Sequence, residues 1–188
     1  GAWRAAAHTR LTLAGKGLTF SGDAALGTGA LVFDPGSSLT ARAVSFDDGA
    51  WVSGGLTGWD QHAVRLITTT GGITGAWRAG DVLLDGVAAS EHGYINTDGR
   101  NMQYSSRWDG LDSAASGTFR VADGKTFEVT GALSNNTAQL NPDWDGRSLT
   151  KAGGGTLILS ADNLYDAGTR VVEGSLQLGS GGGTRAGV

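Results

Sequence analysis

Short apolar segments with alternating side chains recur along the whole chain and predict β-strands. Each segment is two to four residues long, and such segments are bounded by Gly, Asp, Asn or Ser, which favour tight turns. No window of about 12 residues carries a helical apolar stripe without Gly, Pro or β-branched runs. The pattern therefore predicts an all-β protein. The predicted strands span residues 11–13, 18–20, 31–33, 44–46, 50–52, 64–67, 82–84, 119–121, 127–129, 157–159, 171–172 and 176–178.

The spacing between these segments predicts stacked coils. Leu11 and Leu31 are 20 residues apart, Leu31 and Ala50 are 19 apart, and Leu157 and Leu176 are 19 apart. A period near 20 places each short strand above its equivalent one turn earlier, at about 4.7 Å. The expected fold is thus a parallel β-solenoid with apolar ladders inside.

Glycine content supports this expectation. The chain of 188 residues contains 33 glycines, about 18% against a usual value of about 7%. Glycine costs about 1 kcal/mol in a helix relative to alanine, but it allows the sharp corners that join short strands. The composition therefore argues against helices and fits strands joined by tight corners.

Charge and cysteine content exclude several functions. The chain has 14 Lys and Arg against 18 Asp and Glu, a net charge of −4, with no basic patch, which argues against a nucleic-acid partner. It has no cysteine, so disulfides, thiolate metal sites and thiol nucleophiles are excluded. We expect neither a membrane-spanning helix nor a signal peptide in these residues, and any export signal is expected to have been cleaved.

The middle of the chain, residues 77–136, is less regular. Residues 91–100 and 105–110 are polar and rich in turn formers, so we expect loops that leave the solenoid wall, either as corner insertions or as recognition loops. The chain is accordingly divided into residues 1–116, coils with loop insertions, and residues 117–188, the C-terminal coils.

The C-terminal region carries glycines at positions 153, 155, 168 and 174 and alternating leucines at positions 157 and 159, a motif that resembles the autotransporter-associated β-strand repeat. Glycines, threonines and alternating leucines recur there at the spacing of that repeat, except that Asp166-Ala167-Gly168-Thr169 stands where the family more often has Gly-Gly-Thr after a Tyr-Thr pair. Residues 117–129 resemble the coil that commonly precedes it. In physical terms Gly153 to Gly155 permit a corner, Leu157 and Leu159 point to one side, Tyr165 can cap the stack, and Asn163 can bond corner backbone. The matching residues are Leu149, Lys151, Gly153, Gly155, Thr156, Leu157, Leu159, Asn163, Tyr165, Gly168, Thr169, Val171, Gly174 and Leu176.

This resemblance implies a right-handed parallel β-helix from the passenger of a Gram-negative autotransporter (type V secretion). Such passengers cross the outer membrane through their own β-barrel translocator and are displayed on the cell surface or secreted. The coils before the barrel act as an autochaperone, a template for folding. The resemblance thus implies a stalk or adhesin, whose partners would be a host-surface protein, a glycan or a second copy.

A search for catalytic groups yields no assignment. His8, His62 and His92 are scattered without zinc-ligand spacing or a nucleophilic pattern. Carboxylates cluster at residues 47–48, 109 and 112, and 143 and 145, but a glycosidase needs two facing carboxyls at a distance that sequence does not supply. We therefore expect no enzyme, no catalytic residue and no cofactor. The alternatives are a carbohydrate-active β-helix enzyme and a spacer for an upstream protease or lipase domain.

One turn imitates part of a calcium loop. Residues 141–146 place oxygen ligands at alternate positions and a glycine at the sixth, but the twelfth position is Ala152 instead of a bidentate Glu. The segment is therefore interpreted as an Asp-rich turn, and no metal site is assigned.

Six tryptophans are unusual in so glycine-rich a chain. They can cover corners or plug an end of the solenoid. The sharper hypothesis is that Trp59, Trp108 or Trp144 forms an exposed platform for sugar or protein contact.

Overall fold

The computed structural model describes residues 2–56, 64–84, 87–88, 93–108 and 115–179. Every regular element in these ranges is a β-strand, which confirms the all-β prediction. Consequently none of the described segments is a helix able to cross a membrane. The chain forms two compact units, one mainly of residues up to Tyr104 and one mainly of residues from Ser105 on. The predicted division into residues 1–116 and 117–188 was based on where the resemblance to the repeat begins in the sequence, and it stays a prediction.

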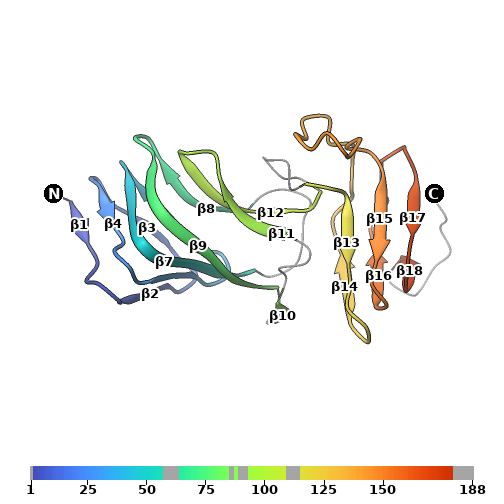
Figure 1. Cartoon of the computed structure of the whole chain (residues 1–188), viewed down its shortest axis with the longest axis horizontal. Coiled ribbons are helices and arrows are strands. Elements are labelled where there is room, and N and C mark those ends of the chain that lie inside the picture. Colours follow the sequence, from blue (N-terminus) through green and yellow to red (C-terminus); the bar gives the residue numbers. More distant parts are fainter. Residues whose placement is uncertain (1, 57–63, 85–86, 89–92, 109–114, 180–188) are drawn as a thin grey trace. The chain divides into compact units, whose positions relative to one another are not determined.

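The first unit contains two sheets (Figure 1). One runs β1-β4-β7-β5-β2, with β9 paired to β7 and β10 to β9, and the other runs β11-β12-β8-β6-β3. The strands are β1 (Trp3–Arg4), β2 (Arg10–Leu13), β3 (Gly17–Thr19), β4 (Ala24–Ala25), β5 (Ala30–Phe33), β6 (Ser38–Ala41), β7 (Val44–Leu56), β8 (Val64–Thr69), β9 (Ile73–Leu84), β10 (Val87–Ala88), β11 (Gly93–Thr97) and β12 (Asn101–Ser106).

Parallel pairing dominates the first unit and follows the predicted period at its start. Leu11 pairs with Leu31 across β2 and β5, as the spacing predicts. Leu31 then pairs with Val52, whereas the 19-residue spacing predicted Ala50, so the predicted register is wrong by two residues. The cause is a bulge: residues 44–56 form one strand, not two, and its register to β9 shifts between Phe46 and Ala50.

Alternation along the strands sends apolar side chains into a common core. Leu31, Phe33, Leu39, Val52 and Ile67 are each at most 2% exposed. Residues between them face outward, because successive side chains of a strand point to opposite faces. Burial of each such side chain stabilises the fold by about 1.5–3 kcal/mol.

The less regular middle contains strands that the sequence did not predict. Residues 93–97 and 101–106 form β11 and β12, so the interpretation of residues 91–100 and 105–110 as loops is wrong there. The Asp98 carboxylate accepts hydrogen bonds from the backbone of Arg100 and Asn101, and Gly99 has a φ of 89°, so the chain reverses tightly. After this reversal β12 pairs antiparallel with β8, which departs from a purely parallel stack.

Candidate functional site

The second unit is built from three layers, each a pair of short strands (Figure 1). Sheet order is β13-β15-β17 on one side and β14-β16-β18 on the other, and all pairs are parallel. Leu157 pairs with Leu176, as the 19-residue spacing predicts. The layers are β13 (Thr118–Arg120) with β14 (Thr126–Val129), β15 (Leu149–Ala152) with β16 (Thr156–Leu159), and β17 (Thr169–Val171) with β18 (Ser175–Leu178).

The motif residues occupy both the strands and the turns of these layers. Of the predicted set, Leu149 and Lys151 lie in β15, Thr156, Leu157 and Leu159 in β16, Thr169 and Val171 in β17, and Leu176 in β18. The turns hold Gly153, Gly155, Asn163, Tyr165, Gly168 and Gly174.

The interior of the unit is an apolar ladder. Leu157 and Leu159 are 0% and 1% exposed, which confirms that they point to the same side. Phe119 and Phe127 stack with ring centroids 6.3 Å apart. Below Leu157 in the register lies Phe127, and above it Leu176, so each layer covers the apolar surface of the previous one.

Lys151 is the unexpected member of this interior. It is 0% exposed, and its Nζ donates hydrogen bonds to the carbonyl oxygens of Ala152 (2.8 Å), Gly153 (2.5 Å) and Glu173 (3.0 Å). An ammonium group has three donors, so all three are used. Burial lowers the pKa of Lys151, and the Glu173 carboxylate partly opposes that shift. Because Glu173 belongs to the third layer, this side chain joins the second layer to the third.

The glycine corner beside Lys151 allows the layers to approach closely. Gly153 has a φ of 75°, and a Cβ there would lie 2.3 Å from the Val121 carbonyl oxygen of the preceding layer. Gly174 repeats the arrangement, since its Cβ would lie 2.4 Å from the carbonyl oxygens of Gly153 and Gly155. Side chains at these positions would force the layers apart, which confirms the predicted corner.

Replacing Gly153 with alanine is expected to destabilise the second unit beyond the cost of backbone strain. Gly124 is the matched control, because its φ of 69° is similar and no atom lies within 4 Å of the position of its Cβ. Both substitutions place an L-residue in the left-handed region, but only Gly153→Ala adds the clash, which should cost about 1–3 kcal/mol more. Urea unfolding of the two variants measures this difference, and equal losses would mean that the corner relaxes freely.

Three aromatic side chains from the turns of the second unit pack together. The Trp108 ring centroid lies 5.3 Å from that of Trp144 and 5.2 Å from that of Tyr165. Trp108 Nε1 donates to the Ser134 carbonyl oxygen at 2.7 Å, and Trp144 Nε1 donates to the Ser148 carbonyl oxygen at 2.8 Å. The buried indoles thus have their polar groups satisfied.

The expected exposed platform at Trp108 and Trp144 is therefore wrong. These residues are 1% and 6% exposed, because their rings pack against one another and against Tyr165. This arrangement matches the other interpretation of the tryptophans, as covers of corners and ends. Trp59 lies outside the described residues.

Amide side chains connect the turns of successive layers. Asn163 Oδ1 accepts a hydrogen bond from Leu133 N–H at 2.9 Å, and its Nδ2 donates to the Ala161 carbonyl oxygen at 3.0 Å. The predicted role of Asn163 in bonding corner backbone is confirmed.

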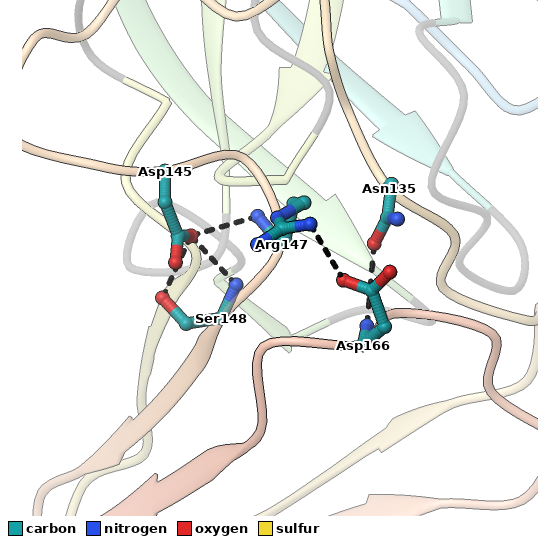
Figure 2. Close-up of polar contacts among 5 residues, drawn as sticks. All are labelled: Asn135, Asp145, Arg147, Ser148 and Asp166. Carbon is teal, nitrogen blue, oxygen red and sulfur yellow. Dashed lines mark hydrogen bonds and ion pairs between the residues drawn. The ribbon is translucent and has the colours of Figure 1, made fainter.

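A cluster of polar side chains on the surface connects the segment before β15 to the segment before β17 (Figure 2). Its members are Asn135, Asp145, Arg147, Ser148 and Asp166. An Arg147 guanidinium nitrogen lies 3.3 Å from Asp166 Oδ1, and Asp166 N–H donates to Asn135 Oδ1. Asp145 Oδ1 accepts hydrogen bonds from the backbone N–H of Arg147 and from both the backbone and the hydroxyl of Ser148. Burial opposes ionisation of Asp145, but these hydrogen bonds lower its pKa overall.

The other histidines and carboxylates considered for catalysis or metal binding do not form a common site in the described part of the chain. Asp145, from the turn that imitates a calcium loop, caps its own backbone, and Asp47 lies 3.7 Å from the Arg4 guanidinium. His8 is exposed in a turn, and among the residues that the structure describes no three His, Asp or Glu side chains form a metal-ligand cluster. The residues His62, His92, Asp109 and Asp112 lie outside the described ranges.

The second unit defines a class of protein in which parallel layers of short strands are joined by glycine corners. Aromatic side chains pack beside these layers, and amide side chains form hydrogen bonds between their turns. Residues 149–178 match the family model described as Passenger-associated-transport-repeat. The match confirms the predicted resemblance to an autotransporter passenger with an associated repeat. An autotransporter passenger implies a linked outer-membrane translocator domain. No curated protein and no solved structure matched the chain.

Proposed function

We propose that this chain is a non-catalytic segment of an autotransporter passenger, folded as a right-handed parallel β-helix. It serves as a stalk or adhesin that is displayed on the cell surface or released, and its C-terminal unit is the folding template, or autochaperone. Its partner in export is the outer-membrane β-barrel of the same protein. The observation that carries the proposal is the uninterrupted parallel register of three layers across residues 118–178.

The template role rests on local contacts in the second unit. Each layer pairs with its neighbours, so stability is a sum of nearest-neighbour terms and folding can begin at the best-packed layers. Two side chains add hydrogen bonds between layers. The Lys151 ammonium donates to the Glu173 carbonyl oxygen, and the Asn163 side chain accepts from Leu133 N–H. A unit with such contacts can form early and hold its structure while preceding residues fold.

A non-catalytic role is supported by what the carboxylates of the second unit do. Asp145 accepts three hydrogen bonds from its own turn, and Asp166 is paired with Arg147. These contacts stabilise turns at the surface.

Refolding of full-chain variants, each with a cavity-forming substitution in one unit, tests whether the second unit acts as a folding template for the first. Leu157 in the second unit and Leu39 in the first are both 0% exposed, so Leu→Ala at either site should cost about 2–5 kcal/mol. In pulse-labelled hydrogen exchange, Leu157→Ala is expected to delay protection of β5 and β7 as well as β14 and β16. Leu39→Ala should leave protection of β14 and β16 at the wild-type rate.

The opposite order would reject the template. If β5 and β7 gain protection at the wild-type rate in Leu157→Ala, the first unit folds without help from the second.

A further inference from the structure

Trp51 on β7 is an exposed aromatic side chain. It is 46% exposed, and it is the only aromatic residue in the described ranges with more than a third of its surface in solvent. Its neighbours in sequence, Ala50 and Val52, are 1% and 0% exposed and face the core. Trp51 therefore points away from the core, where its large apolar ring adds little to stability.

The strand register places two arginines on the same face. Arg10, Ala30, Trp51 and Arg78 are aligned in one row across β2, β5, β7 and β9. Aligned residues of parallel strands share a face and are about 4.8 Å apart from strand to strand. Arg78 is thus one strand from Trp51, and Arg10 is two strands away on its other side.

Both arginines face solvent. Each is exposed, and among the side chains that the structure describes no carboxylate forms an ion pair with either one. Arg10 Nε makes one long hydrogen bond, 3.5 Å, to Thr12 Oγ1.

Small residues leave the Trp51 ring open. Ala30 separates it from Arg10, and Gly80 lies on the β9 side. A Cβ on Gly80 would lie 3.7 Å from Trp51 Cε3, so a side chain there would contact the ring. The absence of a side chain at this position keeps that edge of the ring uncovered.

We propose that Arg10, Trp51 and Arg78 form a binding face for an acidic polysaccharide. The apolar face of a sugar ring packs on the indole, and the carboxylates of neighbouring uronate units bind the guanidinium groups, which match carboxylate geometry. A row of side chains across four strands suits an extended polymer better than a small molecule, which prefers a concave pocket.

Charge complementarity favours this ligand over nucleic acid. The two arginines are a local positive site on a chain of net charge −4. Nucleic-acid binding relies on many phosphate contacts, which an acidic chain with two arginines in this row does not provide.

Equilibrium binding by the full chain tests the face. The probe is a defined oligogalacturonate, titrated by calorimetry and by tryptophan fluorescence, with the same oligomer after reduction of its carboxyls and with oligo(dT) for comparison. Trp51→Ala is expected to weaken binding of the oligogalacturonate about tenfold. Arg10→Gln and Arg78→Gln should each weaken it about threefold to fivefold.

The matched control is Arg120→Gln, which removes the same charge from an exposed position on β13 in the other unit and should bind as wild type. Circular dichroism and urea unfolding confirm that each variant is folded. The proposal is overturned by no binding of oligogalacturonate at millimolar concentration, by unchanged affinity of Trp51→Ala, by equal binding of the reduced oligomer, or by tighter binding of oligo(dT). This proposal goes beyond the folding role, and its assay on folded protein is independent of the refolding experiment.

Discussion

Replacing Trp108 with alanine is expected to lower the free energy of unfolding of the second unit by about 3–5 kcal/mol. Trp108 is 1% exposed, contacts Trp144 and Tyr165, and donates a hydrogen bond to the Ser134 carbonyl oxygen. Its own carbonyl oxygen accepts a hydrogen bond from Asn136 Nδ2. The substitution therefore leaves a large cavity and an unpaired carbonyl at Ser134, and urea unfolding followed by circular dichroism measures the loss.

Trp51→Ala is the matched control for Trp108→Ala. Trp51 is 46% exposed, so its removal should change the free energy of unfolding by less than about 1 kcal/mol. Hydrogen exchange at β14 and β16 assigns the loss to the second unit. If the two variants lose equal stability, the aromatic cluster does not hold this unit together.

Lys151→Met is expected to cost about 3 kcal/mol. Methionine fills a similar volume but donates no hydrogen bond, so three carbonyl oxygens lose the partner that Nζ supplies. Replacing a buried charge with an apolar residue is often neutral when its partners are also removed, but backbone carbonyls stay in place. Lys125→Met is the control, because Lys125 is exposed on the same unit and should lose almost nothing.

The alkaline pH dependence separates the charge of Lys151 from its packing. Its pKa is lowered from 10.5 in the folded protein by burial. Between the folded and the unfolded pKa the unfolded state binds more protons, so this group makes the free energy of unfolding rise with pH in the interval below 10.5. Urea unfolding across that interval should show this rise in Lys125→Met but not in Lys151→Met, whereas parallel profiles would contradict a buried ammonium group.

Local patterns in the sequence predicted much of the second unit. The alternation of Leu157 and Leu159 and the 19-residue step to Leu176 appear in the structure as buried side chains and a parallel register. The glycines from Gly153 to Gly155 predicted a corner, because only residues without a Cβ tolerate both the backbone angle and the close carbonyl. These features depend on neighbours in sequence or one period away.

The burial of Lys151 could have been predicted from the sequence, but the prediction was not made. It stands two residues after Leu149 in an alternating strand, so it faces inward with that leucine, two residues before a glycine corner. Inward lysine is rare, and only the structure shows the three carbonyl oxygens that make it tolerable.

The tryptophans show the limit of sequence reasoning for this chain. Trp51 lies in the predicted strand 50–52 and Trp108 in the predicted loop 105–110, yet Trp108 is buried and Trp51 is exposed. The burial of Trp108 depends on Trp144 and Tyr165, which lie 36 and 57 residues later. The bulge in β7 likewise depends on its register with β9.

By itself the sequence determined the all-β character, the alternation of the core and the likeness to a passenger-associated transport repeat, because strand period, glycine corners and motif spacing are local properties. Tertiary structure alone decided which tryptophans are buried, what the Lys151 ammonium bonds, and that Arg10, Trp51 and Arg78 lie in one row. Those outcomes follow from contacts between strands distant in sequence, whose register is set by the packing of all layers together.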